Sequence, residues 1–248
     1  MKKFSNYLLG ILVFAGIGLL VYHLLQYDQK RTNRELARQI ANLSPRGGLP
    51  DTIEGLIQAI ELYEVQIERN VKEGAQTGVY WKILATRLAD SGMHMDALAA
   101  LEKSIYYNAE DPVLFYLTGV SAGVIAKSHV GFSRDAVRDR EHYFTLSENA
   151  YLRALEIDSS YTRPMYGLGI LYAFELDRPA DAITHLENLL TFHPSDINAM
   201  FVLARAYFMT GQNQRAVDMY DRIISSTRDR NIREEALNNI EIIHRQVL

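Results

Sequence analysis

Residues 200–224, MFVLARAYFMTGQNQRAVDMYDRII, decide the fold because their pattern recurs earlier in the chain. Residues 81–105, WKILATRLADSGMHMDALAALEKSI, have the same length and place similar residues at the same spacings. Both stretches carry alanine at the fifth and seventeenth places, glycine at the twelfth, and large apolar residues between them. This spacing predicts two helices that are joined by a glycine turn and pack closely where the alanines lie.

Two further copies lie between these stretches. One runs from Met165 to Pro194 and needs one extra residue in the turn between its helices. The other begins at Phe115, ends at Leu155 and carries an insertion at about 127–143. A single helical pair would leave an apolar face uncovered, so we expect neighbouring pairs to stack and share a continuous core.

The four copies resemble the tetratricopeptide repeat (TPR) family, in units of about 34 residues between 78 and 228. The resemblance implies an all-α solenoid of helical hairpins. The first helix of each unit, here called helix A, would line a concave groove. With Trp81 and Met200 counted as position 4 of the first and last units, small residues at positions 8 and 20 of each unit would let helix A meet the second helix, helix B.

The resemblance also indicates which side chains face the groove. We expect the partner-binding residues to be Lys82, Tyr116, Arg163, Tyr166, Phe174, Phe201, Arg205 and Phe208. Further lining residues would be Thr86, Val120, Val124, Ile170 and Asn198. Aromatic rings supply contact area and cations supply charge-assisted hydrogen bonds, so an extended peptide or a partner helix is the natural ligand. The alternative is that the rings pack on one another or are covered by the last helix.

One known type of TPR groove is not expected here. Repeats that clamp a C-terminal carboxylate use a lysine and an asparagine, whereas Lys82 is accompanied by Thr86. We therefore do not predict binding of chaperone tails.

The N-terminus predicts a membrane anchor at 1–27. Residues 7–25 carry no formal charge, and as a helix they span about 28 Å, close to the thickness of a bilayer core. No signal-peptidase site follows them, which favours an uncleaved anchor. Lysines precede the span and basic residues follow it, so charge does not decide the orientation. We predict a single-pass inner-membrane protein whose soluble domain is periplasmic; the alternative is a cytoplasmic domain.

The segments around the repeats are also predicted to be helical. Residues 28–50 form a polar juxtamembrane helix and a linker broken by Pro45 and Pro50. Residues 51–77 form a leading helix that stops at Gly74. Residues 229–248 form a capping helix whose apolar side, directed at the stack, consists of Ile232, Leu237, Ile240 and Ile243.

The insertion mixes acidic and basic residues and contains His129 and His142. The two histidines have no third ligand at a metal-binding spacing, so no metal site is predicted. The alternating charges favour the solvated ends of two lengthened helices. A partner contact through the insertion is a further hypothesis.

Composition and motifs exclude several classes of function. The chain has no cysteine and a net charge of −4, which excludes thiol chemistry and disfavours nucleic-acid binding. It has no catalytic motif and no phosphate-binding loop, so no catalytic residue and no cofactor is predicted. The sequence therefore predicts a non-enzymatic scaffold that binds a protein or peptide near the membrane, in cell-envelope assembly or secretion. The alternatives are a structural spacer with a self-filled groove, and an enzyme or metal carrier acting through the insertion.

Overall fold

The computed structural model describes residues 31, 34–35, 38–39, 53–129, 131 and 133–247. Every regular element in this part of the chain is helical, as predicted. The elements are α2 (Ile53–Asp90), α3 (His94–Tyr107), α4 (Pro112–Ser128), α5 (Arg134–Ile157), α6 (Thr162–Ile170), a π-helical turn η1 (Leu171–Glu175), α7 (Pro179–Phe192), α8 (Ile197–Met209), α9 (Asn213–Ser226) and α10 (Arg230–Val247).

The predicted membrane span, 7–25, lies outside the described residues. Among the helices that are described, none combines the length and the hydropathy needed to cross a bilayer.

The chain divides into two compact units, residues 1–73 and 74–248, and α2 contributes to both. In the first unit, α2 exposes several large apolar side chains to solvent: Leu56, Ile57, Ile60, Tyr63, Val65 and Ile67. The predicted helix end at Gly74 is wrong, because α2 continues to Asp90. A glycine inside a helix costs about 1 kcal/mol relative to alanine, which is too little to end a helix without a proline.

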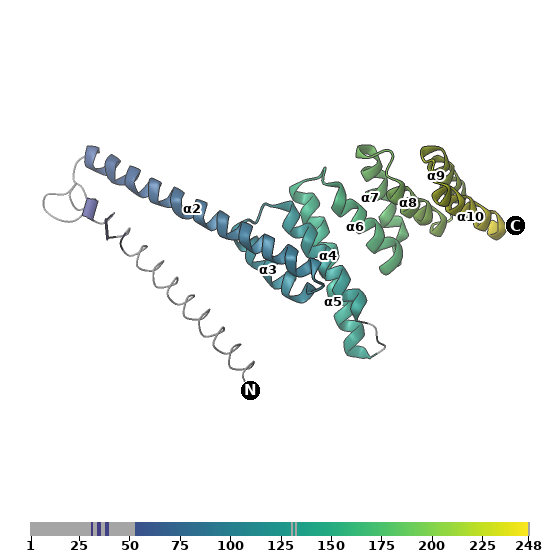
Figure 1. Cartoon of the computed structure of the whole chain (residues 1–248), viewed down its shortest axis with the longest axis horizontal. Helices are drawn as coiled ribbons and strands as arrows, with labels where there is room; N and C mark the ends of the chain where they lie inside the picture. The colour runs from purple at the N-terminus through teal and green to yellow at the C-terminus, as the bar shows by residue number, and fades with distance from the viewer. Residues whose placement is uncertain are drawn as a thin grey trace, which may run out of the picture. The chain divides into compact units, whose positions relative to one another are not determined.

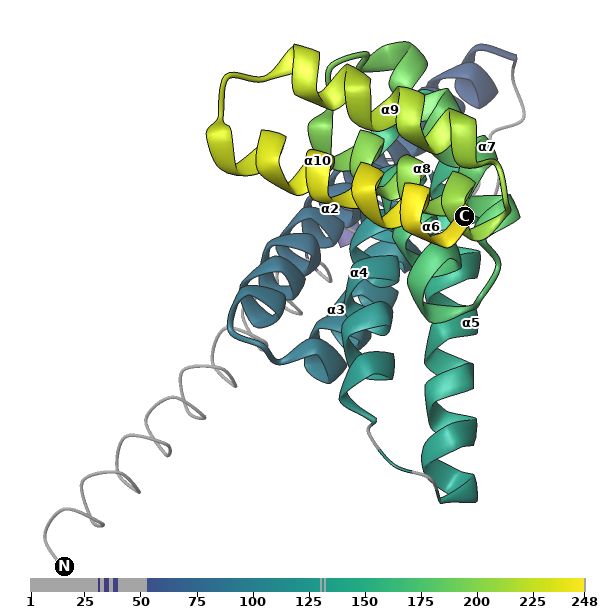
Figure 2. The same cartoon turned by 90° about the vertical axis from the view of Figure 1, so that its right-hand side faces the viewer.

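The second unit consists of stacked helical hairpins (Figure 1). Helix α4 packs on α5, α6 with η1 packs on α7, and α8 packs on α9. Consecutive hairpins meet through α3 and α4, α5 and α6, and α7 and α8, while α10 lies along α9 (Figure 2). The A helices α4, α6 and α8 also contact one another in order, which places them on one face of the stack.

The predicted small residues lie between the helices. The position-8 residues are all buried, and so are the position-20 alanines: Ala85, Gly119, Gly169, Ala204, Ala97, Ala182 and Ala216. In the unit with the insertion, Ser147 takes position 20, and its buried hydroxyl donates to the Gly119 carbonyl at 2.7 Å. The close approach that the sequence pattern predicted is therefore confirmed.

The extra residue of the third unit lies in helix A and not in the turn. The turns of the first and last units contain Gly92 and Gly211 with positive φ, and Asp177 takes the same conformation with φ +51°. The turn is therefore of regular length, and the added residue is taken up before it by η1. There the Leu176 amide bonds to the Leu171 carbonyl, five residues back.

Tyrosines at position 11 tie neighbouring hairpins together. The Tyr172 hydroxyl donates to Glu148 of α5 at 2.8 Å, and Arg178 donates to the same carboxylate oxygen at 2.8 Å. The last hairpin repeats this arrangement with Tyr207, Glu187 and Arg215. In each case the arginine also lies over the tyrosine ring, at 4.5 and 4.1 Å from its centroid. These contacts join the second, third and fourth hairpins side by side.

The final helix covers the end of the stack, as predicted, with one difference. Ile243 is buried, and Ile232 and Ile240 pack against the core. Leu237 is 51% exposed, so its predicted inward position is wrong, and Ala236 is buried instead. The neighbouring alanine fits the close contact with α9, which a leucine would overfill.

Candidate partner-binding site

The A-helix face carries a pocket of about 230 Å³ in the middle of the stack. Its walls come from α4, from α6 and from the residues around the start of α8, with Leu189 of α7 behind them. It brings together three of the eight predicted groove residues, Tyr116, Arg163 and Tyr166, and also the expected Asn198. The three separate helical hairpins thus supply one continuous site.

Aromatic rings form one wall of this pocket. The Tyr116 ring centroid lies 5.6 Å from that of Tyr161 and 6.2 Å from that of Tyr151. Burial raises the pKa of Tyr166, as does the nearby charge of Asp196, so its hydroxyl remains protonated at neutral pH. The wall therefore presents apolar ring area together with a neutral hydroxyl group.

Arg163 supplies the positive charge of the pocket. Its guanidinium carbon lies 5.9 Å from the centroid of the Tyr116 ring, and the residue is exposed. Within the described part of the chain, no carboxylate lies within ion-pair distance of Arg163. Asp196 lines the same pocket, but its carboxylate accepts a hydrogen bond from the Ala199 amide at 3.0 Å and caps α8. Arg163 can therefore pair with a carboxylate brought by a ligand.

The other predicted groove residues lie outside this pocket. Lys82 forms an ion pair with Asp111 at 2.8 Å, so its charge is already matched. Phe201 packs edge-on to Tyr220 at 5.9 Å, and Phe208 is half-buried against the core. Arg205 and Phe174 are exposed, Phe174 by 52%. Around α8 the rings thus partly fill the groove themselves.

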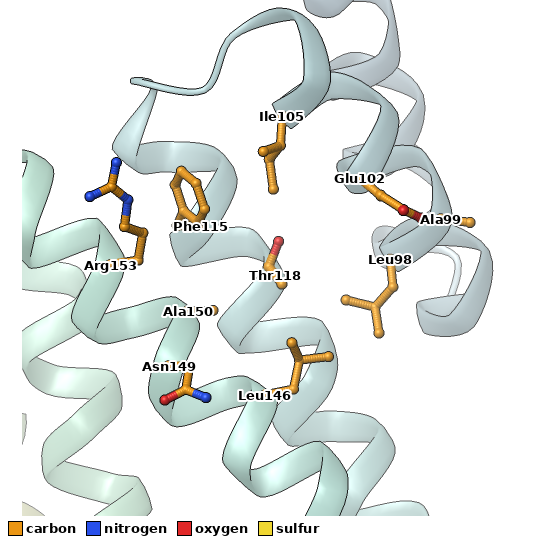
Figure 3. Close-up of a pocket in the computed structure, with 10 residues that line it drawn as sticks. All are labelled: Leu98, Ala99, Glu102, Ile105, Phe115, Thr118, Leu146, Asn149, Ala150 and Arg153. Atoms are coloured by element: carbon orange, nitrogen blue, oxygen red, sulfur yellow. The ribbon is translucent and has the colours of Figure 1, made fainter.

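The sequence did not indicate a second pocket, which has a volume of about 570 Å³ (Figure 3). It lies between the B helices α3 and α5, over α4. Its lining is predominantly apolar, with Leu98, Ile105, Phe115 and Leu146 as the largest such side chains. One signal was available in the sequence: Thr118 stands at position 7, where the other three units have leucine.

The insertion forms the lengthened ends of α4 and α5, as predicted, joined by a short connection before Arg134. A polar pocket of about 610 Å³ lies beside it, where Lys127 of α4 pairs with Glu175 of η1 at 3.2 Å. His129 and His142 both contact the ring of Tyr143 edge-on, at 5.7 and 5.1 Å. In the part of the chain that the structure describes, no three histidine or acidic side chains gather as metal ligands.

Comparison with known proteins identifies the repeats. Residues 173–234 match the family model described as tetratricopeptide repeat. No curated protein matches the sequence. Among solved structures, the crystal structure of MamA protein has a TM-score of 0.51 at 19% identity, covering 80% of this chain and 86% of that chain.

Two further solved structures have the same fold. MamA 41-end from Desulfovibrio magneticus RS-1 has a TM-score of 0.51 at 12% identity, covering 68% of this chain and 94% of its own. TTC0263, a thermophilic TPR protein in Thermus thermophilus, has a TM-score of 0.53 at 16% identity, covering 73% of this chain and 91% of its own. Residues 173–234 therefore match the tetratricopeptide repeat family, and the stacked hairpins have the fold of solved TPR structures.

Proposed function

We propose that this chain is a non-enzymatic adaptor that binds a protein or peptide partner on its A-helix face. TPR proteins are in general interaction scaffolds, which supports this class of function. The observation that carries the proposal is a pocket lined by Tyr116, Tyr166 and Arg163, in which Arg163 pairs with no carboxylate among the described residues.

The chemistry of the pocket suits a peptide that carries a carboxylate next to an apolar side chain. The guanidinium of Arg163 can donate two hydrogen bonds to a carboxylate, and the Asn198 amide can bond to a peptide backbone. The rings of Tyr116 and Tyr166 supply rigid contact area at a low cost in conformational entropy.

The proposal includes a membrane tether at 7–25, with the repeats on the periplasmic side of the inner membrane. The uncharged N-terminal run supports the tether. A tether confines the repeats to a thin layer and so raises their effective concentration for other membrane-bound partners. Cell-envelope assembly or secretion is the setting that fits this arrangement. A reporter enzyme that works only outside the cytoplasm should be active when it is fused to the C-terminus. Activity of a fused reporter that works only in the cytoplasm would contradict this orientation.

In-cell photocrosslinking of the full chain tests the partner site. A photoreactive amino acid is placed at Tyr166 in the pocket or, as the matched control, at Tyr106, which is 82% exposed on α3. We expect a discrete partner band from position 166 only. The band should be lost with Arg163→Glu and retained with Arg138→Glu, which changes an exposed arginine within the insertion. The same bands from both positions, or bands insensitive to Arg163→Glu, would contradict the proposal.

One observation favours the second candidate, a structural spacer. Phe201 and Phe208 already pack against the protein's own core, so the groove near α8 is partly self-filled. A spacer would give no crosslinked partner from position 166, and the experiment above therefore separates the two functions.

A further inference from the structure

The groove between the B helices lies where the first and second hairpins meet, because the side chains there do not fill the space between the hairpins. In the third and fourth units, the residues at positions 4 and 7 are almost fully buried: Met165 1%, Leu168 0%, Met200 0% and Leu203 1%. The equivalent residues of the second unit are Phe115 and Thr118, and both are only half-buried on the wall of the groove. Thr118 is smaller than leucine, and its hydroxyl bonds back to the Leu114 carbonyl at 2.9 Å.

The contact between the first and second hairpins also lacks the tyrosine hydrogen bond that joins each later pair of hairpins. Position 11 of the second unit is Ala122, where the two following units have Tyr172 and Tyr207. Helices α3 and α5 therefore form two walls over α4 with an apolar space between them (Figure 3). A space of about 570 Å³ is within the usual range for sites that bury a ligand.

The charges at the rim of the groove are predominantly acidic. Glu102 lies on the α3 wall. Arg153 lies on the α5 wall, but Glu110 and Glu156 pair with its guanidinium at 3.4 and 3.0 Å. The guanidinium also lies 5.8 Å from the centroid of the Phe115 ring. Three carboxylates thus outnumber one cation that is already paired with two of them, so the rim attracts positive charge and repels an anionic headgroup.

We propose that this groove docks a basic amphipathic helix of a partner protein. Apolar side chains on one face of that helix fill the space lined by Leu98, Ile105 and Phe115. Lysine or arginine residues beside that face pair with Glu102 and with the two glutamates around Arg153. The site is separate from the A-helix pocket and does not depend on the function proposed for it.

The absence of cysteine from the sequence permits a direct test by disulfide trapping. The full chain receives one cysteine at Ala99, which lines the groove, or at Ala180, an exposed alanine on the B helix α7, as the matched control. The probe is a synthetic helical peptide of about four turns, with leucines and one cysteine along one face and lysines elsewhere. A second peptide replaces every lysine with glutamate.

We expect the lysine peptide to be trapped at position 99 about tenfold faster than at position 180, and the glutamate peptide to show no such preference. Thr118→Leu, added to the Ala99→Cys chain, fills the groove and should remove the preference while circular dichroism shows an intact fold. Glu102→Gln should weaken it, and Glu235→Gln on α10 should leave it unchanged.

Three results would overturn the proposal. Equal trapping at positions 99 and 180 would show that the groove does not select the helix. Retention of the preference in Thr118→Leu would place the contact elsewhere. Equal trapping of both peptides at position 99, abolished by added laurate, would assign the groove to an acyl chain instead of a basic helix.

Discussion

The ring of Tyr151 occupies space that two glycines leave open. A β-carbon on Gly119 of α4 would lie 2.5 Å from the ring, and one on Gly167 of α6 would lie 2.6 Å from it. Tyr151 takes position 24, where two of the other units have Leu101 and Leu186. The larger side chain and the missing β-carbons therefore compensate for one another at the contact between the second and third hairpins.

Gly119→Ala should lower the stability of the second unit by about 1–3 kcal/mol through overpacking. Thermal melting of the full chain, followed by circular dichroism, measures the change. Tyr151→Leu should recover most of the loss in the Gly119→Ala background, although alone it leaves a cavity and destabilises the protein. Additive effects of the two substitutions would show that the residues do not compensate for one another.

His185 makes the stability of the third hairpin dependent on pH. Its ring stacks on Tyr172 with 5.8 Å between centroids. Burial lowers its pKa below the usual 6.5, and the charge of Asp181 opposes this shift only in part. The folded state therefore binds a proton less readily than the unfolded state. The contribution to stability is complete above about pH 6.5 and is lost as the pH falls through the lower pKa of the folded state.

The melting temperature should accordingly fall between about pH 7.5 and 5.5, and the fall should be smaller in His185→Gln. His193→Gln, which changes an exposed histidine after the same helix, is the control and should melt like the wild type at both pH values. An identical pH response in wild type and His185→Gln would contradict the assignment.

At the scale of the elements, the repeated spacing predicts the helical hairpins, but it does not predict which element holds the extra residue of the third unit. The spacing of small residues correctly predicted the hairpins, and the third unit was correctly expected to hold one extra residue. The sequence could not place that residue, because a π-helical turn and a longer loop preserve the same downstream spacing. Asp177 was not an evident turn residue either, since it takes a positive φ where two other units have glycine.

Helix α2 shows the opposite case, because Gly74 suggested a helix end that the structure does not have. Gly74 and Gly78 both lie inside the helix, and they differ in their surroundings. A β-carbon on Gly74 would make an ordinary contact with the Tyr107 ring at 3.7 Å. One on Gly78 would lie 2.8 Å from the Tyr107 β-carbon, which cannot move without α3. Only Gly78 is therefore required for packing.

Gly74→Ala should raise the stability by about 0.5–1 kcal/mol, the difference in helix propensity. Gly78→Ala should instead lower it by about 1–3 kcal/mol, because the added carbon forces α3 away from α2. Denaturant unfolding of the two full-length variants measures both changes. Destabilisation by Gly74→Ala would contradict a continuous α2, since it would indicate a helix end at that residue.

At the scale of the whole molecule, the stack presents two faces with different chemistry. The A-helix face offers Arg163, which pairs with no carboxylate in the described part of the chain, in a pocket that Tyr116 and Tyr166 also line. The B-helix face offers an apolar groove with an acidic rim. The resemblance to TPR proteins indicated Tyr116, Arg163 and Tyr166 of the A-helix pocket by their positions in the repeat. It did not indicate Thr162, Leu189 or Asp196, which line the same pocket. It could not predict that Lys82 would pair with Asp111 or that Phe201 would pack on Tyr220, because those partners lie elsewhere in the sequence.

The central claim is that the A-helix pocket, and not the B-helix groove, holds the partner captured at position 166. The most direct measurement is the photocrosslinking yield from that position in Arg163→Glu and in Thr118→Leu, relative to the wild type. We expect Arg163→Glu to reduce the yield about tenfold or more and Thr118→Leu to leave it unchanged. An unchanged yield in Arg163→Glu, or a loss in Thr118→Leu with the fold intact, would contradict the account.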